Sequence, residues 1–358
     1  MTRLVIPTRN RPVSFARVLR YLCEFYPGTR LLVANGSEAS YATAYSDAVE
    51  AARERIDLTY LEYDSGLTLG ERMSDALNQI DDDFVIAGAD DDYPVLQAFS
   101  GQETFLRDNP DYVISIGGII GLRLFDSGDL QAKLLYARGI EQDKPVQRIV
   151  NYIKWPYATS YGVVRREHYI ERCSRAELNG FPGFGDYSVA FHDCLAGKIK
   201  ALDNICYFTT TNPTHSKVRR RSSLFYLERA PEILALKQHY REMLVQQEDV
   251  TAEQADAISV RLINTRIAEL ITPAPQNRPG FGQSELFLDP VVQKQYADFQ
   301  ALFDDDTDIR RRLLPQLRTI VTAIGQVADD GRDNYGEPEI YDSLGDMGTL
   351  APIVGLKR

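Results

Sequence analysis

The chain has 358 residues, of which 44% are hydrophobic and 25% are charged, and its formal net charge is −11. An isoelectric point near 5.0 argues against a nucleic-acid partner, because proteins that bind nucleic acids present clustered positive charge. The four cysteines form no Cys-x-x-Cys pair, so neither a zinc site nor a disulfide framework is indicated. The sequence shows no signal peptide and no run that approaches the ~20 apolar residues of a membrane span. We therefore expect a cytoplasmic protein, and the basic run at 219–221 leaves open a peripheral contact with the inner face of the membrane.

The first ninety residues alternate short apolar runs with amphipathic segments. The apolar runs predict strands at 4–6, 31–34, 58–61 and 84–89. A helix is expected from Pro12, with apolar residues at spacings of three and four, and it should end before Pro27. Two further helices are expected at about 40–55 and 69–80. Strands joined by helices of this length imply a parallel, doubly wound sheet with right-handed crossovers.

The rest of the chain has a mixed middle part and a helical end. Strands are expected at 112–116, 160–164, 199–202 and 206–209, with a helix at about 186–196. After about 222 the pattern is helical, with a capping box from Thr251 to Gln254 and a helix at 308–327 that Pro315 is expected to bend. We therefore divide the chain into a unit at 1–220, a helical region at 221–330 and a polar tail at 331–358.

Three aspartates, Asp90, Asp91 and Asp92, directly follow the apolar run at 84–89. Carboxylates at the end of a buried strand are costly unless a positive charge lies against them, and this edge of an open α/β sheet is where ligands bind. The acidic runs at 81–83 and 304–306 do not follow a buried strand, and they are interpreted as solvated turns. Position therefore favours a divalent cation at Asp90–Asp92, because hard cations take oxygen ligands.

Several segments, in this order, resemble an inverting family 2 glycosyltransferase with the GT-A fold. Val5 to Arg11 is similar to the opening strand and its Pro-Thr-x-Asn-Arg turn, and Phe84 to Tyr93 is similar to the strand that carries the metal-binding Asp-x-Asp. The later segments are Tyr161 to Glu167, Asn179 to Phe181, Gly185-Asp186 and 195–199. The resemblance spans about residues 3–215 and implies an α/β, Rossmann-like GT-A fold. A mostly parallel central sheet would be flanked by helices and followed by an all-α extension.

The resemblance implies a metal-dependent hexosyltransferase-type enzyme. It would move a sugar from a nucleotide-diphosphate sugar, with a UDP-sugar favoured, to a hydroxyl of a saccharide or lipid-linked saccharide. Bacterial-type surface polysaccharide or glycoconjugate synthesis is the expected setting, and 1–220 would be the catalytic domain. Mn²⁺ or Mg²⁺ would be bound by Asp92, Asp90 and His215. The residues implied at the nucleotide-sugar are Pro7, Thr8, Arg9, Arg11, Asn35, Arg72, Asp90, Asp91 and Lys217.

Each of these roles has a plainer alternative. Arg9, Arg11 and Arg72 would otherwise be solvated charges at helix ends, and Lys217 with the following arginines would be a solvated loop. A lone histidine such as His215 is usually a surface or packed residue. Asp91 is expected to face the opposite side from its neighbours, as alternate residues of an extended segment do.

Asp186 is the implied general base, because a carboxylate can deprotonate an attacking hydroxyl. The family usually has Glu-Asp where this chain has Gly185-Asp186. Asp186 is also suited to be the N-cap of the helix at 187–196, and Asp193 is the weaker candidate for the base. Trp155 is interpreted either as a sugar-stacking residue or as a core residue.

Two other function classes stay open. A sugar nucleotidyltransferase has a related sheet but needs a glycine-rich loop after the first strand, and the turn from Pro7 to Asn10 contains no glycine. A degenerate, non-catalytic binding module is the other alternative, because Gly185 replaces the expected acid.

Overall fold

The computed structural model describes residues 2–124, 130–154, 156–175, 184–211, 223–271, 288–304 and 307–325. The strands are β1 Arg3–Thr8, β2 Arg30–Asn35, β3 Asp57–Glu62, β4 Phe84–Ala87, β5 Tyr93–Pro94, β6 Tyr112–Leu124, β7 Leu130–Leu135, β8 Gly162–Arg165 and β9 Lys198–Thr211. The helices of the first half are α1 Pro12–Phe25, α2 Ala42–Arg53, α3 Leu69–Asn78, α4 Phe99–Asp108 and α5 Pro145–Lys154. The later helices are α6 Arg166–Cys173, α7 Gly185–Ala196, α8 Ser223–Glu228, α9 Ala230–Val245, α10 Ala252–Ile271, α12 Pro290–Ala301 and α13 Asp308–Gly325.

The nine strands form one sheet in the order β3-β2-β1-β4-β8-β6-β9-β5, with β7 paired to β6. The first four strands pair in parallel, as the sequence predicted. Strand β8 runs antiparallel to both β4 and β6, whereas β6 and β9 are parallel. The mostly parallel α/β sheet flanked by helices is therefore confirmed, with β8 as an antiparallel strand at its centre.

The local signals that set the first helices are simple. Helix α1 starts with Pro12 at its first turn, and its face with Phe15, Val18 and Leu22 is buried. Helix α3 starts with a capping box in which Thr68 and Glu71 exchange side-chain and backbone hydrogen bonds. This second pattern was visible in the sequence but was not used to place α3.

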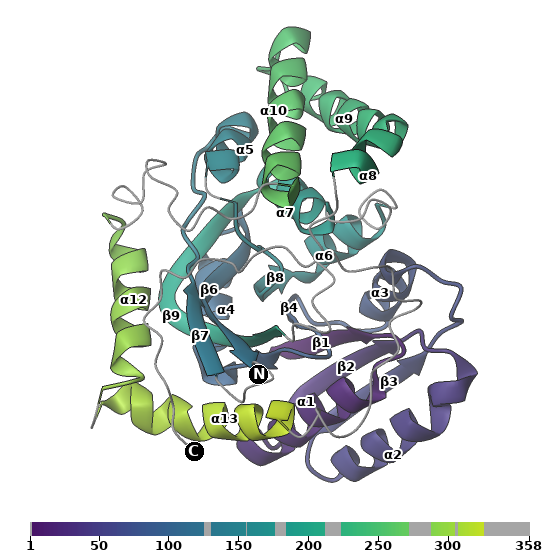
Figure 1. Ribbon diagram of the computed structural model, residues 1–358, viewed down its shortest axis with the longest axis vertical. Coiled ribbons are helices and arrows are strands. Elements are labelled where there is room, and N and C mark those ends of the chain that lie inside the picture. Colours follow the sequence, from purple (N-terminus) through teal and green to yellow (C-terminus); the bar gives the residue numbers. More distant parts are fainter. Residues whose placement is uncertain are drawn as a thin grey trace.

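Two hydrophobic cores lie on the two faces of the sheet. In β1, Leu4 and Ile6 belong to one core and Val5 belongs to the other, because alternate residues of a strand face opposite sides. The first core includes buried residues of α1, α2, α12 and α13, and the second includes residues of α3, α5, α7, α9 and α10. Figure 1 shows α9 and α10 at the top of the molecule and α13 along the bottom.

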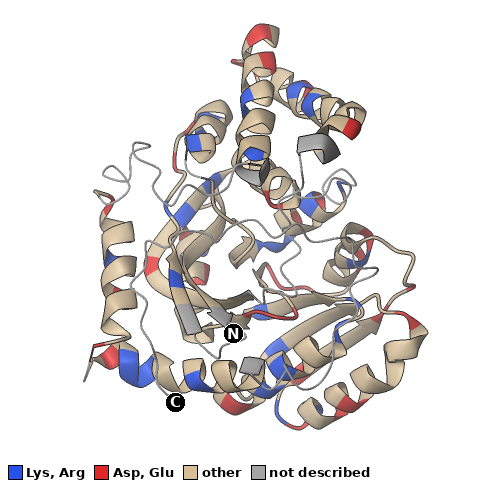
Figure 2. Cartoon of the chain, viewed as in Figure 1, with Lys and Arg blue, Asp and Glu red and all other residues tan. Residues whose placement is uncertain are grey.

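The helical C-terminal part is thus divided between both sides of the molecule. Helix α12 packs against β9 and helix α13 packs against α1. No helix in the described part of the chain is long and apolar enough to cross a membrane. Lysine and arginine are mixed with aspartate and glutamate on the helices seen in Figure 2.

Candidate active site

The three aspartates lie at the carboxyl end of β4, where the polypeptide turns into β5. Asp90 and Asp91 are in a turn, and β5 then pairs antiparallel with β9 through Tyr93 and Phe208. Asp90 and Asp92 are 4% and 5% exposed, so two carboxylates are buried at this edge. Burying carboxylates is favourable only where hydrogen bonds or positive charge compensate them, and the contacts of each aspartate show how far this is achieved.

Asp90 is bound by the turn that follows β1. The hydroxyl of Thr8 donates to Oδ2 of Asp90 at 2.8 Å and lies 2.7 Å from the hydroxyl of Tyr45. The guanidinium of Arg11 donates to Oδ1 of Asp90. Asn10 has a φ of 54°, a conformation that asparagine tolerates better than most residues, and this turns the chain back toward the aspartates. The motif after the first strand and the acidic motif after the fourth therefore meet in one place.

Asp91 also pairs with Arg11, through the second terminal nitrogen of the guanidinium. The prediction that Asp91 faces away from its neighbours is wrong, because Asp90 and Asp91 lie in a turn, where the alternation of a strand does not apply. Arg11 is half-buried and is not the solvated helix-end charge of the alternative interpretation.

Asp92 accepts one hydrogen bond on each carboxylate oxygen. The hydroxyl of Tyr161 donates to Oδ2 at 2.5 Å, and the backbone N–H of Thr210 donates to Oδ1 at 3.2 Å. Burial and the charge of Asp91 raise the pKa of Asp92 well above its usual value, although Tyr161, Thr210 and Arg11 oppose the shift. The ionised form of Asp92 is therefore under-compensated by the protein alone.

This electrostatic deficit fits a divalent cation. Carboxylate oxygens are the donors that Mg²⁺ and Mn²⁺ prefer, and Mg²⁺ is commonly bound by one or two carboxylates together with substrate phosphates and water. Among the described residues no group of three His, Cys, Asp or Glu side chains gathers around one point. The third expected ligand, His215, lies outside the described residues, as do Lys217 and Trp155.

Arg72 lies beneath the turns that follow β1 and β2. It is 3% exposed, and its Nη1 donates to the carbonyl oxygens of Thr8 and Ala34, both at 2.9 Å. Its Nε is buried without a hydrogen-bond partner, and a Cβ at Gly36 would lie only 2.5 Å from that atom. Burial and then the charge of Arg9 lower the pKa of Arg72. The alternative of a solvated helix-end charge is excluded for Arg72.

The other residues of the first two turns that are expected at the nucleotide differ in exposure and in hydrogen bonding. Arg9 is exposed and Pro7 is half-buried. The side chain of Asn35 is oriented within the protein, because its Nδ2 donates to the Tyr60 hydroxyl at 2.6 Å and its Oδ1 accepts from the Ser37 N–H at 2.9 Å. A carboxamide has a second N–H and a second lone pair, so these two bonds fix its orientation without using its full hydrogen-bonding capacity.

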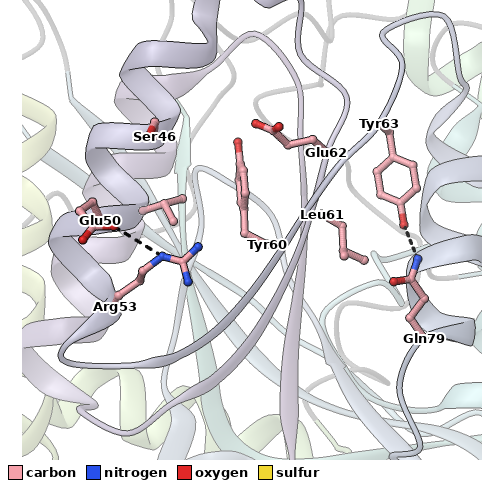
Figure 3. Close-up of a pocket in the computed structure, with 9 residues that line it drawn as sticks. Ser46, Glu50, Arg53, Tyr60, Leu61, Glu62, Tyr63 and Gln79 are labelled. Atoms are coloured by element: carbon pink, nitrogen blue, oxygen red, sulfur yellow. Dashed lines mark hydrogen bonds and ion pairs between the residues drawn. The ribbon is translucent and has the colours of Figure 1, made fainter.

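Tyr60 also lines a hollow of about 400 Å³ along the edge strand β3, shown in Figure 3. Glu50 and Arg53 of α2 form an ion pair on one side, and Gln79 lies near Tyr63 on the other. None of the residues that line this hollow belongs to the predicted site, so the hollow is separate from the aspartate cluster.

Asp186 is exposed in the first turn of α7. Phe184, not Asp186, occupies the N-cap, so the N-cap interpretation is wrong. A carboxylate in the first turn is favoured by the positive end of the helix dipole. The charge of Asp186 contributes, after burial and the charges of Asp92 and Asp91, to raising the pKa of Tyr161. Asp186 is therefore within electrostatic reach of the residue that binds Asp92.

Asp193 has a different environment from Asp186. It is fully buried and accepts hydrogen bonds from Thr159 at 2.6 Å and from Arg172 at 3.3 Å, and it lies 2.7 Å from Nε2 of His168. A carboxylate enclosed in this way cannot reach an acceptor hydroxyl. Asp193 is therefore excluded as the base, and the role of Asp186 stays a prediction.

Two partners of Asp92 were not singled out from the sequence. In the sequence Tyr161 is the first residue of a motif that resembles the family pattern, and Thr210 belongs to no motif. The pairing of β5 with β9 brings Thr210 to Asp92, and a contact between residues so far apart in sequence has no local pattern.

The sheet order and the helices that flank it are those of a GT-A-like fold. No family model and no curated sequence matches the chain. Among solved structures it is similar to S. aureus TarS 1-349 in complex with UDP-GlcNAc, with a TM-score of 0.53 and 13% identity over 96% of this chain and 100% of that chain. It is also similar to a longer S. aureus TarS structure, with a TM-score of 0.50 and 15% identity over 90% of this chain and 55% of that chain. This structural similarity, at low sequence identity, confirms the predicted fold.

Proposed function

We propose that the protein is a metal-dependent glycosyltransferase that moves a sugar, with inversion, from a UDP-sugar to a hydroxyl acceptor. The observation that carries this proposal is the pair of buried, oriented carboxylates, Asp90 and Asp92, at the carboxyl edge of the sheet. In an open α/β sheet this edge binds ligands, and the charge of Asp92 is incompletely compensated there.

The donor side of the reaction would be built on Asp92, Asp90 and His215 as ligands of Mn²⁺ or Mg²⁺. When bound, such an ion acts as a Lewis acid that neutralises charge on the leaving diphosphate. Thr8 and Arg11 orient Asp90, so that its carboxylate does not rotate away when the donor arrives. The nucleotide would lie over the turns after β1 and β2, against Pro7, Arg9 and Asn35, with Asp91 and Lys217 near the diphosphate. Arg72 would act from beneath by holding the carbonyls of these two turns in place.

The acceptor side would depend on Asp186. Its exposed carboxylate would accept the proton of the attacking hydroxyl while the new glycosidic bond forms and the bond to the diphosphate breaks. Attack from the face opposite the leaving group gives inversion. Gly185 has no side chain to assist this step, so Asp186 would act without the neighbouring acid seen in the family pattern.

The choice of UDP is supported by the S. aureus TarS structure in complex with UDP-GlcNAc. The proposed acceptor is a saccharide or a lipid-linked saccharide of a bacterial-type surface polysaccharide or glycoconjugate, and the proposed location is the cytoplasmic side of the membrane. These assignments follow the family resemblance over residues 3–215.

The test needs no knowledge of the acceptor, because glycosyltransferases of this kind can be assayed by slow donor hydrolysis. Release of UDP from UDP-glucose, UDP-galactose and UDP-GlcNAc is measured with and without Mn²⁺, and GDP-mannose serves as the base control. We expect hydrolysis of one UDP-sugar that depends on Mn²⁺. Asp92→Asn should lose Mn²⁺-dependent UDP binding, whereas Asp186→Asn should keep binding and lose turnover.

Other outcomes identify the alternatives. Wild-type turnover in both variants, or equal turnover after removal of divalent metal, would reject the assigned roles. Pyrophosphate release from a nucleoside triphosphate and a sugar phosphate would identify a sugar nucleotidyltransferase. If calorimetry detected no binding of UDP, GDP or Mn²⁺, either alone or in combination, the result would support a non-catalytic binding module.

A further inference from the structure

Tyr161 occupies a backbone position that the sheet fixes closely. It directly precedes β8, which lies between β4 and β6. The next residue, Gly162, approaches β6 so closely that an added Cβ would lie 2.1 Å from the carbonyl oxygen of Ser115. Only glycine permits this approach, so the path of the chain at Tyr161 is determined by the pairing of two strands.

The ring of Tyr161 is held by a row of aromatic side chains. Its centroid lies 5.1 Å from that of Tyr207 in an edge-to-face arrangement, and Tyr207 lies 5.5 Å from Phe99 in the same geometry. The hydroxyl of Tyr207 donates to the carbonyl oxygen of Ala87, the last residue of β4, at 2.7 Å. Edge-to-face pairs of this kind stabilise the relative orientation of two rings beyond the effect of their buried area. The position of the Tyr161 hydroxyl is therefore set before any ligand binds.

This hydroxyl and one backbone N–H determine the orientation of Asp92. Tyr161 donates to Oδ2 and Thr210 donates to Oδ1, so each carboxylate oxygen has one donor and keeps further acceptor capacity. Two donors on two oxygens fix the rotation of the carboxylate about its bond to Cβ. The remaining lone pairs are then presented in one direction.

We propose that Tyr161 is a positioning residue, whose hydroxyl holds the Asp92 carboxylate in the orientation that receives the divalent cation of the donor complex. The inference rests on the proposed function and assigns a role that the family resemblance did not give. Partners of this kind around metal ligands affect metal affinity by about 10- to 100-fold when they are removed. Tyr161 does not itself touch the cation or the sugar in this assignment.

The experiment compares two substitutions that each remove one tyrosine hydroxyl and keep the ring. Tyr161→Phe removes the donor to Asp92, and Tyr240→Phe removes a buried hydroxyl that lies 2.6 Å from the hydroxyl of Ser188 and takes no part in holding Tyr161. Calorimetry with Mn²⁺ in the presence of UDP is expected to show about 10-fold or greater loss of affinity in Tyr161→Phe. Tyr240→Phe is expected to lose less than about twofold. Equal affinities in Tyr161→Phe and wild type, or equal losses in both variants, would overturn the proposal.

A second measurement is independent of metal binding. The rotation of the Asp92 carboxylate about its bond to Cβ is compared between metal-free crystal structures of the wild type and Tyr161→Phe. We expect this rotation to change in the variant. An unchanged carboxylate would overturn the positioning role. A third outcome separates the two proposals. If the wild type bound neither Mn²⁺ nor UDP while the carboxylate still rotated in the variant, the proposed function would be rejected and the positioning role of Tyr161 would stand.

Discussion

Replacing Asp193 by asparagine should destabilise the protein strongly, although this aspartate lies only seven residues after the candidate base. Asp193 is 0% exposed and is the counter-charge of Arg172, which is 4% exposed and lies 3.3 Å away. Removing one charge of a buried pair costs about 3–5 kcal/mol, because the other charge stays buried without compensation. A protein of this kind has a total stability of about 5–15 kcal/mol, so the loss would be a large share of it.

Urea unfolding at pH 7 measures this effect directly. Asp186→Asn is the matched control, because the loss of an exposed carboxylate from the first turn of α7 should change the free energy of unfolding by about 1 kcal/mol at most. If Asp193→Asn also stayed within about 1 kcal/mol of wild type, the assignment of a buried ion pair would be refuted.

The pH dependence gives the sign of the same interaction. Burial alone would raise the pKa of Asp193, but the charge of Arg172 and the hydrogen bond with His168 outweigh it, so the pKa is lowered. A carboxylate with a lowered pKa in the folded state contributes its full stability above the unfolded pKa of about 3.9 and loses it at lower pH. The difference between wild type and Asp193→Asn should therefore be constant near neutrality and shrink below about pH 4.

Further predictions concern buried or closely packed positions of the fold. Gly162→Ala should cost at least the ~1–3 kcal/mol of an overpacked position in thermal or urea unfolding, since its Cβ would collide with a carbonyl of β6. Gly101→Ala, in α4, should instead be neutral or stabilising, because the nearest atom to its Cβ would be 3.8 Å away. Burial lowers the pKa of His192 to about 3, so stability should fall as the pH drops below ~6.5, and His192→Leu should reduce this slope. Gln316→Ala should cost about 0.5–1.5 kcal/mol in urea, the net contribution of a hydrogen bond, because the hydroxyls of Tyr21 and Tyr26 keep acceptors in the Pro94 carbonyl and in Oε1 of Gln97, and an unchanged unfolding midpoint would contradict this.

The parts of the fold with local periodicity could be predicted from the sequence. The four parallel strands, α1 and the position of Asp90–Asp92 followed from apolar runs and their spacing. Strand β9 was expected as two strands, yet it is continuous from Lys198 to Thr211. Its pairing with β6 shifts register around Gly118, which accommodates the polar residues in its middle, and this irregularity depends on the partner strand.

The chemistry of the site could be predicted only as far as residue type and strand position determine it. Sequence alone could not decide that Arg72 is buried, because that depends on two turns that close over it. It also could not identify Tyr161 as the partner of Asp92, since 69 positions separate them in the chain. The roles of His215 and Lys217 stay predictions, because these residues lie outside the described part of the structure.

Helices α12 and α13 have a consequence for how the protein could be truncated. Oε1 of Gln316 in α13 accepts from the hydroxyls of Tyr21 and Tyr26, and Gln295 in α12 donates to the carbonyl of Leu202. Removing everything after residue 220 would uncover the apolar surface beside α1 and β9, so we expect the N-terminal half to aggregate when expressed alone.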